Sequence, residues 1–318
     1  MNNHRNNYRI LAEEFYYNGK LESAIEFYNK ALTYRGSVDD TCLILFNLGV
    51  IFWEMGNIRK AIYYNKKVLE NDKNYKDAYY QLGLLFEDVG DINKSIKSYR
   101  RALRIDPEDK LSLYNLAVLY DTMGRDYLAE SIYLNLIRLD PSNSYAMNNL
   151  GSLYESRGEY KKALKYVNRS IDIKDDFYLS HFNLGVILKA LKRDEEAIFE
   201  YNKSLSLKED YQYTYLNLSA IYIEKKDYLK SIHVLTKGIA ECKVNHDLYY
   251  NRACSYAILN NREEALNDIR KCLELSPKLL KWVESDRDLD CLREDKEFIN
   301  ILINVKNNVR KDIENDNY

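Results

Sequence analysis

Apolar side chains recur along this chain at helical spacing, in short stretches that polar turns separate. Within residues 79–107 the apolar and small positions Ser95, Ile96, Tyr99, Ala102 and Leu103 follow an i, i+1, i+4, i+7, i+8 spacing. That spacing lines one side of an α-helix, so it predicts an amphipathic helix. Similar stripes recur along the chain, and one helical pair is too small to bury its stripe alone.

The stripes repeat with a fixed period of 34 residues. Pro107 and Pro141 are one period apart, and Pro277 follows after four further periods. Because proline disfavours helix in the residue before it, Asp106-Pro107 and Asp140-Pro141 mark helix ends. A fixed period of this size predicts stacked copies of one small unit, not a single globular core.

Eight units align on a Leu-Gly pair, or its equivalent, in the first helix of each. They are 5–41, 42–75, 76–109, 110–143, 144–177, 178–211, 212–245 and 246–279. The first unit holds three additional residues near Arg35-Gly36-Ser37. Residues 1–4 are predicted to form a flexible N-terminus and residues 280–318 a helical C-terminal cap.

Two sets of glycines have distinct predicted roles. Gly49, Gly83, Gly151 and Gly185 follow the leucine of the first helix, where a missing side chain lets the partner helix approach. A second set ends the first helix, where a left-handed cap favours glycine: Gly19, Gly56, Gly90, Gly124 and Gly158. The last three units carry Lys192, Lys226 and Asn260 there instead. We therefore expect strained or differently closed turns in units six and seven.

The order of residue types within a unit is itself characteristic. The unit YYQLGLLFEDVGDINKSIKSYRRALRIDP (79–107) contains Leu-Gly-x-x-Phe/Tyr, then Gly, then Ala/Ser-Ile, then Tyr, then Ala-Leu, then Asp-Pro. This pattern resembles the tetratricopeptide repeat, and eight copies stand in register over residues 5–279. The resemblance implies an all-α fold, a right-handed superhelical solenoid of antiparallel helix pairs. It also implies a bacterial-type array whose first helices line a concave groove.

Residues 280–318 leave the repeat pattern but keep helical spacing in Leu289, Leu292, Phe298, Ile299 and Leu302. The segment resembles the helices that close bacterial arrays of this family, and we expect it to cover the apolar face of unit eight. Its aspartate-rich run 286–290 lacks the glycine and terminal glutamate of a calcium loop.

Composition narrows the classes of partner and chemistry. The 47 basic and 49 acidic residues nearly balance, so charge gives no general drive toward nucleic acid or membrane. The five cysteines are scattered and form no Cys-x-x-Cys pair, which favours reduced thiols and a cytoplasmic location. The four histidines show no metal-ligand spacing, and no nucleophile or phosphate-binding motif is present. We therefore expect neither an enzyme nor a bound cofactor.

The sixth place of seven units carries a side-chain amide. These residues are Asn47, Gln81, Asn115, Asn149, Asn183, Asn217 and Asn251. The resemblance places them on the inner face, where an amide offers a donor and an acceptor to the backbone of an extended peptide. We call this set the amide ladder. The alternative is that these amides are only a solvated polar inner face.

Aromatic and apolar residues flank the amide ladder at the second, fifth and ninth places. This aromatic strip comprises Phe46, Tyr80, Tyr114, Tyr145, Phe182, Tyr213 and Tyr250, with Val118 and Val186. An exposed apolar strip of this kind indicates an interaction surface, although each ring alone could pack against its neighbours. Four acidic residues follow at the twelfth and thirteenth places, where they could select a basic ligand or form an ordinary solvated face. They are Glu87, Asp88, Asp121 and Glu155.

These features favour a scaffold that binds a protein or peptide segment in its groove, as a monomer. One alternative is a structural subunit that self-assembles or bridges a complex, and another is a peptide-sensing regulator that acts in trans. Binding of acidic chaperone tails is disfavoured, because the family's basic clamp positions are aromatic and amide here.

Overall fold

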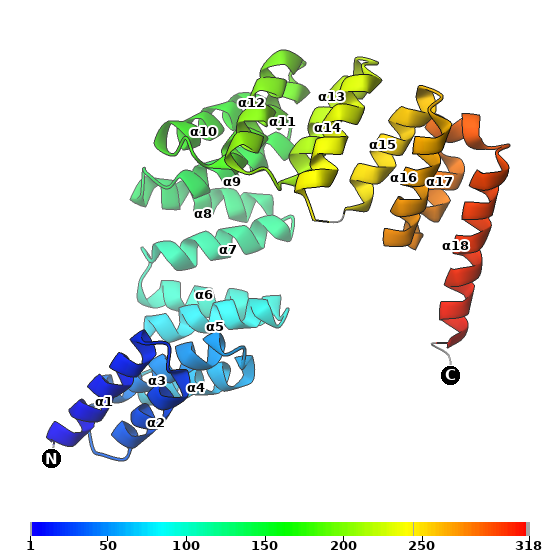
Figure 1. Cartoon of the computed structure of the whole chain (residues 1–318). Coiled ribbons are helices and arrows are strands. Elements are labelled where there is room, and N and C mark those ends of the chain that lie inside the picture. The colour runs from blue at the N-terminus through cyan, green and yellow to red at the C-terminus, as the bar shows by residue number, and fades with distance from the viewer. Residues whose placement is uncertain (1, 244, 316–318) are drawn as a thin grey trace. The chain divides into compact units, whose positions relative to one another are not determined.

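The computed structural model describes residues 2–243 and 245–315, and over these residues the regular structure is helical throughout (Figure 1). The repeat region contains α1 (Asn2–Tyr17), α2 (Leu21–Leu32), α3 (Val38–Glu54), α4 (Ile58–Asn71), α5 (Lys76–Asp88), α6 (Ile92–Ile105), α7 (Lys110–Thr122), α8 (Asp126–Leu139), α9 (Ser144–Ser156), α10 (Tyr160–Ile173), α11 (Tyr178–Ala190), α12 (Asp194–Leu207), α13 (Gln212–Glu224), α14 (Tyr228–Glu241), α15 (His246–Ile258) and α16 (Arg262–Leu275). The C-terminal segment adds η1 (Pro277–Leu279), α17 (Leu280–Ser285), η2 (Arg287–Leu292) and α18 (Lys296–Asn315). The all-α prediction is confirmed.

Helices pack in sequential pairs: α1 with α2, α3 with α4, α5 with α6 and α7 with α8 in the first part of the chain, and α11 with α12, α13 with α14 and α15 with α16 in the second. Second helices such as α4, α6, α10 and α14 also contact the first helix of the next repeat. The chain divides into two compact units, residues 1–153 and 154–318, and each is described by itself. From the third repeat on, each first helix begins where its predicted unit begins.

The beginning of the chain differs from the sequence-based picture. We expected residues 1–4 to be flexible, but α1 begins at Asn2, while Met1 lies outside the described residues. Buried Arg5 anchors the beginning of α1. It donates to the Tyr34 carbonyl and the Thr41 hydroxyl and pairs with Asp40. The additional residues before the second repeat do not only lengthen a loop, because α3 starts at Val38, ahead of the predicted boundary at 42.

Glycine in the first helix makes room for a side chain of the second helix, as predicted. A Cβ placed on Gly83 would lie 2.3 Å from Cε1 of Tyr99, and one on Gly185 would lie 2.6 Å from Cε1 of Tyr201. Both tyrosines are fully buried. These two repeats therefore depend on a small residue at this position, because real Cβ atoms do not approach other atoms so closely.

The turns between paired helices are closed alike in early and late repeats. Lys192, Lys226 and Asn260 adopt φ angles of 63°, 59° and 58°, in the same left-handed region as the glycines of the earlier repeats. The amide of Lys192 donates to the Lys189 carbonyl at 2.9 Å, and the matching bond from Gly90 is 2.8 Å long. The expectation of a different closure is wrong, while strain at the two lysines follows from their positive φ.

The cap packs on repeat eight through an apolar cluster. Val283, Leu289, Leu292, Phe298 and Ile301 are buried together with residues of α15 and α16. Of the residues predicted to form the stripe of the cap, Leu289 and Leu292 lie in η2, while Ile299 is exposed on α18. The cap thus covers the apolar end of the last repeat, which no further repeat of the described chain covers.

Candidate functional site

The amide ladder is built into hydrogen bonds with tyrosines. In residues 1–153, Asn47 donates to the Tyr28 hydroxyl at 3.0 Å, and Asn115 donates to the Tyr80 hydroxyl at 3.3 Å. Asn149 donates to two hydroxyls, those of Tyr114 at 3.3 Å and Tyr133 at 3.4 Å. Tyr28 and Tyr133 come from second helices, so these amides tie the first-helix face to the repeat core.

The other members of the ladder have different surroundings. Gln81 is only 4% exposed, and its Oε1 has no hydrogen-bond partner among the described atoms. In residues 154–318, Asn217 and Asn251 donate at 2.8 Å to backbone carbonyls of their own helices, Tyr213 and Asp247. Asn183 is half-buried. The ladder that the sequence shows as uniform is therefore not uniform in its bonding.

Each hydrogen bond reduces what an amide can offer to a ligand. An asparagine amide has two N–H donors and one carbonyl oxygen. Asn149 directs both N–H groups to tyrosines, and its oxygen accepts from Asn148 at 3.3 Å. Asn47 and Asn115 each use one N–H in these bonds, which leaves one N–H and the oxygen. Asn47, Asn115, Asn217 and Asn251 thus each keep one N–H and the oxygen for a ligand, whereas Asn149 has the least left to offer.

The aromatic strip is graded in exposure. Tyr145 and Tyr213 are exposed, at 44% and 52%, whereas the remaining strip residues are half-buried. The half-buried residues are Phe46, Tyr80, Tyr114, Phe182 and Tyr250, with Val118 and Val186. Phe182 packs edge-on against Tyr211 at 5.1 Å between ring centroids. Most of the strip is therefore only partly open to a ligand, with Tyr145 and Tyr213 as its most exposed rings.

Two pockets open beside predicted first-helix positions of residues 1–153. One, of about 310 Å³, is lined by Glu13, Tyr16, Tyr17, Tyr28, Leu43, Asn47, Val50 and Ile51. The other, of about 440 Å³, is lined by Lys110, Leu111, Tyr114, Asp140, Asn143 and Tyr145. Both volumes fall in the range of sites that accept a side chain or small ligand. Sequence reasoning found Asn47, Tyr114 and Tyr145 but missed the exposed Leu111 beside them.

The four acidic candidates are not a uniform solvated row. Glu87 accepts the Tyr99 hydroxyl and, at 3.3 Å, the Ser95 hydroxyl, while Asp88 accepts the indole N–H of Trp53 at 2.7 Å. Burial raises the pKa of Asp121 and of Glu155 above its usual range. Three of the four are half-buried, and only Asp88 is exposed.

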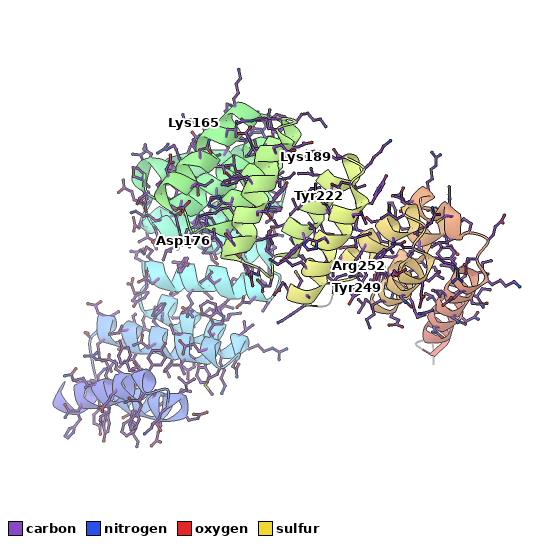
Figure 2. All side chains as sticks on the ribbon, turned by 45° about the horizontal axis from the view of Figure 1, so that its top comes forward. Lys165, Asp176, Lys189, Tyr222, Tyr249 and Arg252 are labelled. Carbon is purple, nitrogen blue, oxygen red and sulfur yellow. The ribbon has the colours of Figure 1, made fainter. Side chains whose placement is uncertain are left out.

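A buried ion pair in repeat eight escaped the sequence analysis. Arg252 of α15 donates to both carboxylate oxygens of Asp268 on α16, at 2.7 and 2.8 Å, and to the Thr236 hydroxyl at 2.9 Å. The rings of Tyr249 and Tyr256 lie 5.8 and 5.7 Å from its guanidinium carbon, and Figure 2 shows Arg252 beside Tyr249. Burial raises the pKa of Asp268, whereas the bonded carboxylate raises that of Arg252. We treat the pair as ionised, because arginine keeps its proton and both carboxylate oxygens accept from it.

The cap region brings three groups together that could in principle ligate a metal. Ligand atoms of Cys254, Asp286 and Asp288 lie within 4.8 Å of one another. Burial raises the pKa of the Cys254 thiol, and the Tyr250 hydroxyl donates to Asp286. The Cys254 sulfur also lies 3.8 Å from the Asp286 carboxylate, so these groups already contact one another within the cap. Among the described helices, none combines the length and apolar character needed to span a bilayer.

Comparison with known proteins follows the same repeats. Models described as Tetratricopeptide repeat match residues 8–37, 44–75, 77–109, 112–143, 132–165, 178–211 and 246–279. Heat shock protein STI1 of Saccharomyces cerevisiae is 40% identical over 57 residues, which are 18% of this chain and 10% of that protein. The sti1 homolog of Schizosaccharomyces pombe is 42% identical over 57 residues, again a tenth of its length. The matched stretch therefore spans only a small part of these relatives.

Solved structures share the fold at low identity. A tetratricopeptide repeat protein from Parabacteroides merdae has a TM-score of 0.62 at 18% identity, over 83% of this chain and 98% of that one. Pseudomonas aeruginosa pilF has a TM-score of 0.57 at 20% identity, over 71% of this chain and 99% of that one. The Cut9-Hcn1 hetero-tetramer of the APC/C gives 0.59 at 17% identity, over 90% of this chain and 52% of that one. With the family models matching more than half of its residues, the chain belongs to the tetratricopeptide repeat family.

Proposed function

We propose that this protein is an adaptor that binds a segment of a partner protein on its first-helix face. Tetratricopeptide repeats generally mediate contacts between proteins, which supports the class of function. The observation that carries the proposal is the pair of pockets in residues 1–153. They open beside amide-ladder and aromatic-strip residues, namely Asn47, Tyr114 and Tyr145.

The two sets of side chains would divide the work of binding. Asn47 and Asn115 have an N–H and an oxygen to offer to the backbone of an extended segment, at about 1 kcal/mol for each net bond. The pocket beside Leu111 and Tyr145 would take an apolar side chain, which supplies more free energy per residue than one such bond. Asn149 contributes through the tyrosines it holds.

The acidic residues enter the proposal as scaffold. Glu87 and Asp88 already accept hydrogen bonds from Tyr99 and Trp53. Burial disfavours the charged forms of Asp121 and Glu155, as their raised pKa values indicate. Selection of a basic ligand by Glu87 and Asp88 would require breaking these internal contacts, so we assign these two carboxylates to holding the helices.

Removal of the apolar pocket tests the proposal directly. Leu111 is 59% exposed and Tyr145 is exposed, so the variant Leu111→Ser with Tyr145→Ala should fold normally. The matched control, Leu128→Ser with Tyr127→Ala, changes the same residue types on α8. Partners would be captured from lysate and their contact sites mapped by crosslinking.

A partner that wild type and control retain, that the pocket variant loses, and that crosslinks near Leu111 supports first-helix binding. Equal capture by all three proteins contradicts the proposal and moves the interaction elsewhere. Light scattering over a concentration series checks the accompanying prediction of a monomer.

A further inference from the structure

The second helix of the third repeat, α6, is basic along its exposed side. It carries Lys94, Lys97, Arg100, Arg101 and Arg104 and no acidic residue between Ile92 and Ile105. All five cations are exposed, while Ile96, Tyr99 and Ala102 face the core. A chain whose basic and acidic residues nearly balance therefore concentrates five positive charges on one helix. We call this surface the basic face of α6.

Most of these charges are not neutralised within the protein. Lys94 pairs with Asp91. Among the described side chains, Lys97, Arg100, Arg101 and Arg104 form no hydrogen bond or ion pair. Some cations at other second helices do find partners: Arg193 of the α12 N-cap contacts Glu196, and Lys230 of α14 contacts Asp227. Unpaired like charges on one helix raise the local potential and leave it available to a partner.

The second helix of the preceding repeat, α4, extends the positive region, and the acidic residues of α2 and α8 limit the region on either side. Helix α4 adds exposed Arg59 and Lys66, which also have no ion pair among the described residues, and it packs on α5 as α6 does. By contrast, α2 carries two glutamates and α8 carries Asp126 and Glu130. Within residues 1–153, the positive region thus lies on the second helices of repeats two and three.

We propose that the basic face of α6 binds a short acidic segment of a partner protein. The cations from Lys94 to Arg104 span about 15 Å along the helix, at about 1.5 Å per residue. An extended chain covers that length with about five residues. Arginine suits such a partner, because its planar fork binds a carboxylate through two parallel hydrogen bonds.

The surface fits other polyanions less well. Single-stranded nucleic acid is held by aromatic stacking as well as charge, yet the only ring on α6, that of Tyr99, is buried. On the neighbouring helix α4 the Tyr63 ring is exposed, but it already contacts the Lys67 ammonium, 5.7 Å from the ring centre. Peripheral membrane helices pair their cations with an apolar face that enters the lipid, whereas the apolar face of α6 is packed in the core.

The test uses a fluorescein-labelled hexaglutamate peptide and fluorescence anisotropy on the full chain. Wild type should bind the peptide, and affinity should fall as salt rises. The variant Arg100→Gln, Arg101→Gln, Arg104→Gln should bind roughly tenfold more weakly, as expected for several exposed pairs acting together. Its circular dichroism should match wild type, because these side chains have no partners in the fold.

The matched control is Lys161→Gln, Lys162→Gln, Lys165→Gln on α10, which removes the same charge elsewhere. It should bind within about twofold of wild type if position, not net charge, decides. No saturable binding of the peptide, or equal losses in the two variants, overturns the proposal. Tighter binding of a single-stranded oligonucleotide of equal charge, or of phosphatidylserine vesicles, would also overturn it. The inference concerns a second-helix surface, so it stands or falls separately from the first-helix proposal.

Discussion

Substitution of Gly83 by alanine sets two effects of opposite sign against each other. In an exposed helix interior alanine is favoured over glycine by about 1 kcal/mol. Here the new Cβ would lie 2.3, 2.6 and 2.6 Å from three atoms of the Tyr99 ring. The ring is fully buried and its hydroxyl donates to Glu87, so it cannot move aside without losing that bond. Overpacking of this kind costs about 1–3 kcal/mol, and we place this contact at the upper end. The net loss should be about 1–2 kcal/mol.

Hydrogen exchange of peptides from α5 and α6 is the assay of choice, because repeat arrays need not unfold as one unit. In the variant Gly83→Ala the backbone amides of α5 and α6 should exchange faster, whereas exchange in repeat eight should change little. The double variant Gly83→Ala, Tyr99→Ile copies the pair Ala253 and Ile269, both fully buried in repeat eight, and should recover part of the loss. Slower exchange in the single variant would mean that helix propensity outweighs the contact, and our reading of this glycine would be refuted.

Three further perturbations test other parts of the fold. Burial alone would lower the pKa of His181, but its hydrogen bonds to the Glu200 carboxylate and the Asp175 carbonyl raise it overall. The folded pKa thus lies above the unfolded value, so the stabilisation by His181 is complete at low pH and is lost as pH rises through the folded pKa. The melting temperature of wild type should therefore fall between pH 6 and 9, and that of His181→Gln should not. Lys192→Gly should stabilise the chain by about 0.5–1 kcal/mol in thermal melts, because glycine removes the cost of φ 63°. Asp268→Asn should lose about 3 kcal/mol, seen as faster exchange of α15 and α16, because it leaves the guanidinium partly buried without a counter-charge; unchanged exchange would show that the pair contributes nothing.

The repeat architecture could be predicted from sequence because its signals are local. The spacing of Ser95, Ile96, Tyr99 and Ala102 within one helix and the 34-residue period follow from residues close in the chain. The missed start of α1 at Asn2 had no local signal. Buried Arg5 is held there by Asp40 and Thr41, which are near it only after the first two repeats have packed.

The candidate site could be predicted less completely. The sequence singled out Asn47, Tyr114 and Tyr145, and these three residues line the two pockets. The hydrogen bonds of the ladder residues could not be predicted from the sequence. Asn149 is occupied by Tyr114 and Tyr133, while Asn217 donates to its own helix, although both residues occupy the same place of the repeat. A hydrogen bond to a residue 16 or 35 positions away depends on how neighbouring helices meet, and the period alone does not encode it.

By itself, the sequence determined the all-α repeat, its small-residue contacts and the helical cap, because periodic burial leaves a periodic pattern of residue types. Only the tertiary structure decided which amides keep bonding capacity and that Glu87 and Asp88 accept hydrogen bonds from Tyr99 and Trp53. It also decided that Lys97, Arg100, Arg101 and Arg104 of α6 have no counter-charge among the described residues. Charge pairing and hydrogen bonding depend on distances of a few ångströms between side chains from different helices, and those distances exist only once the repeats have packed.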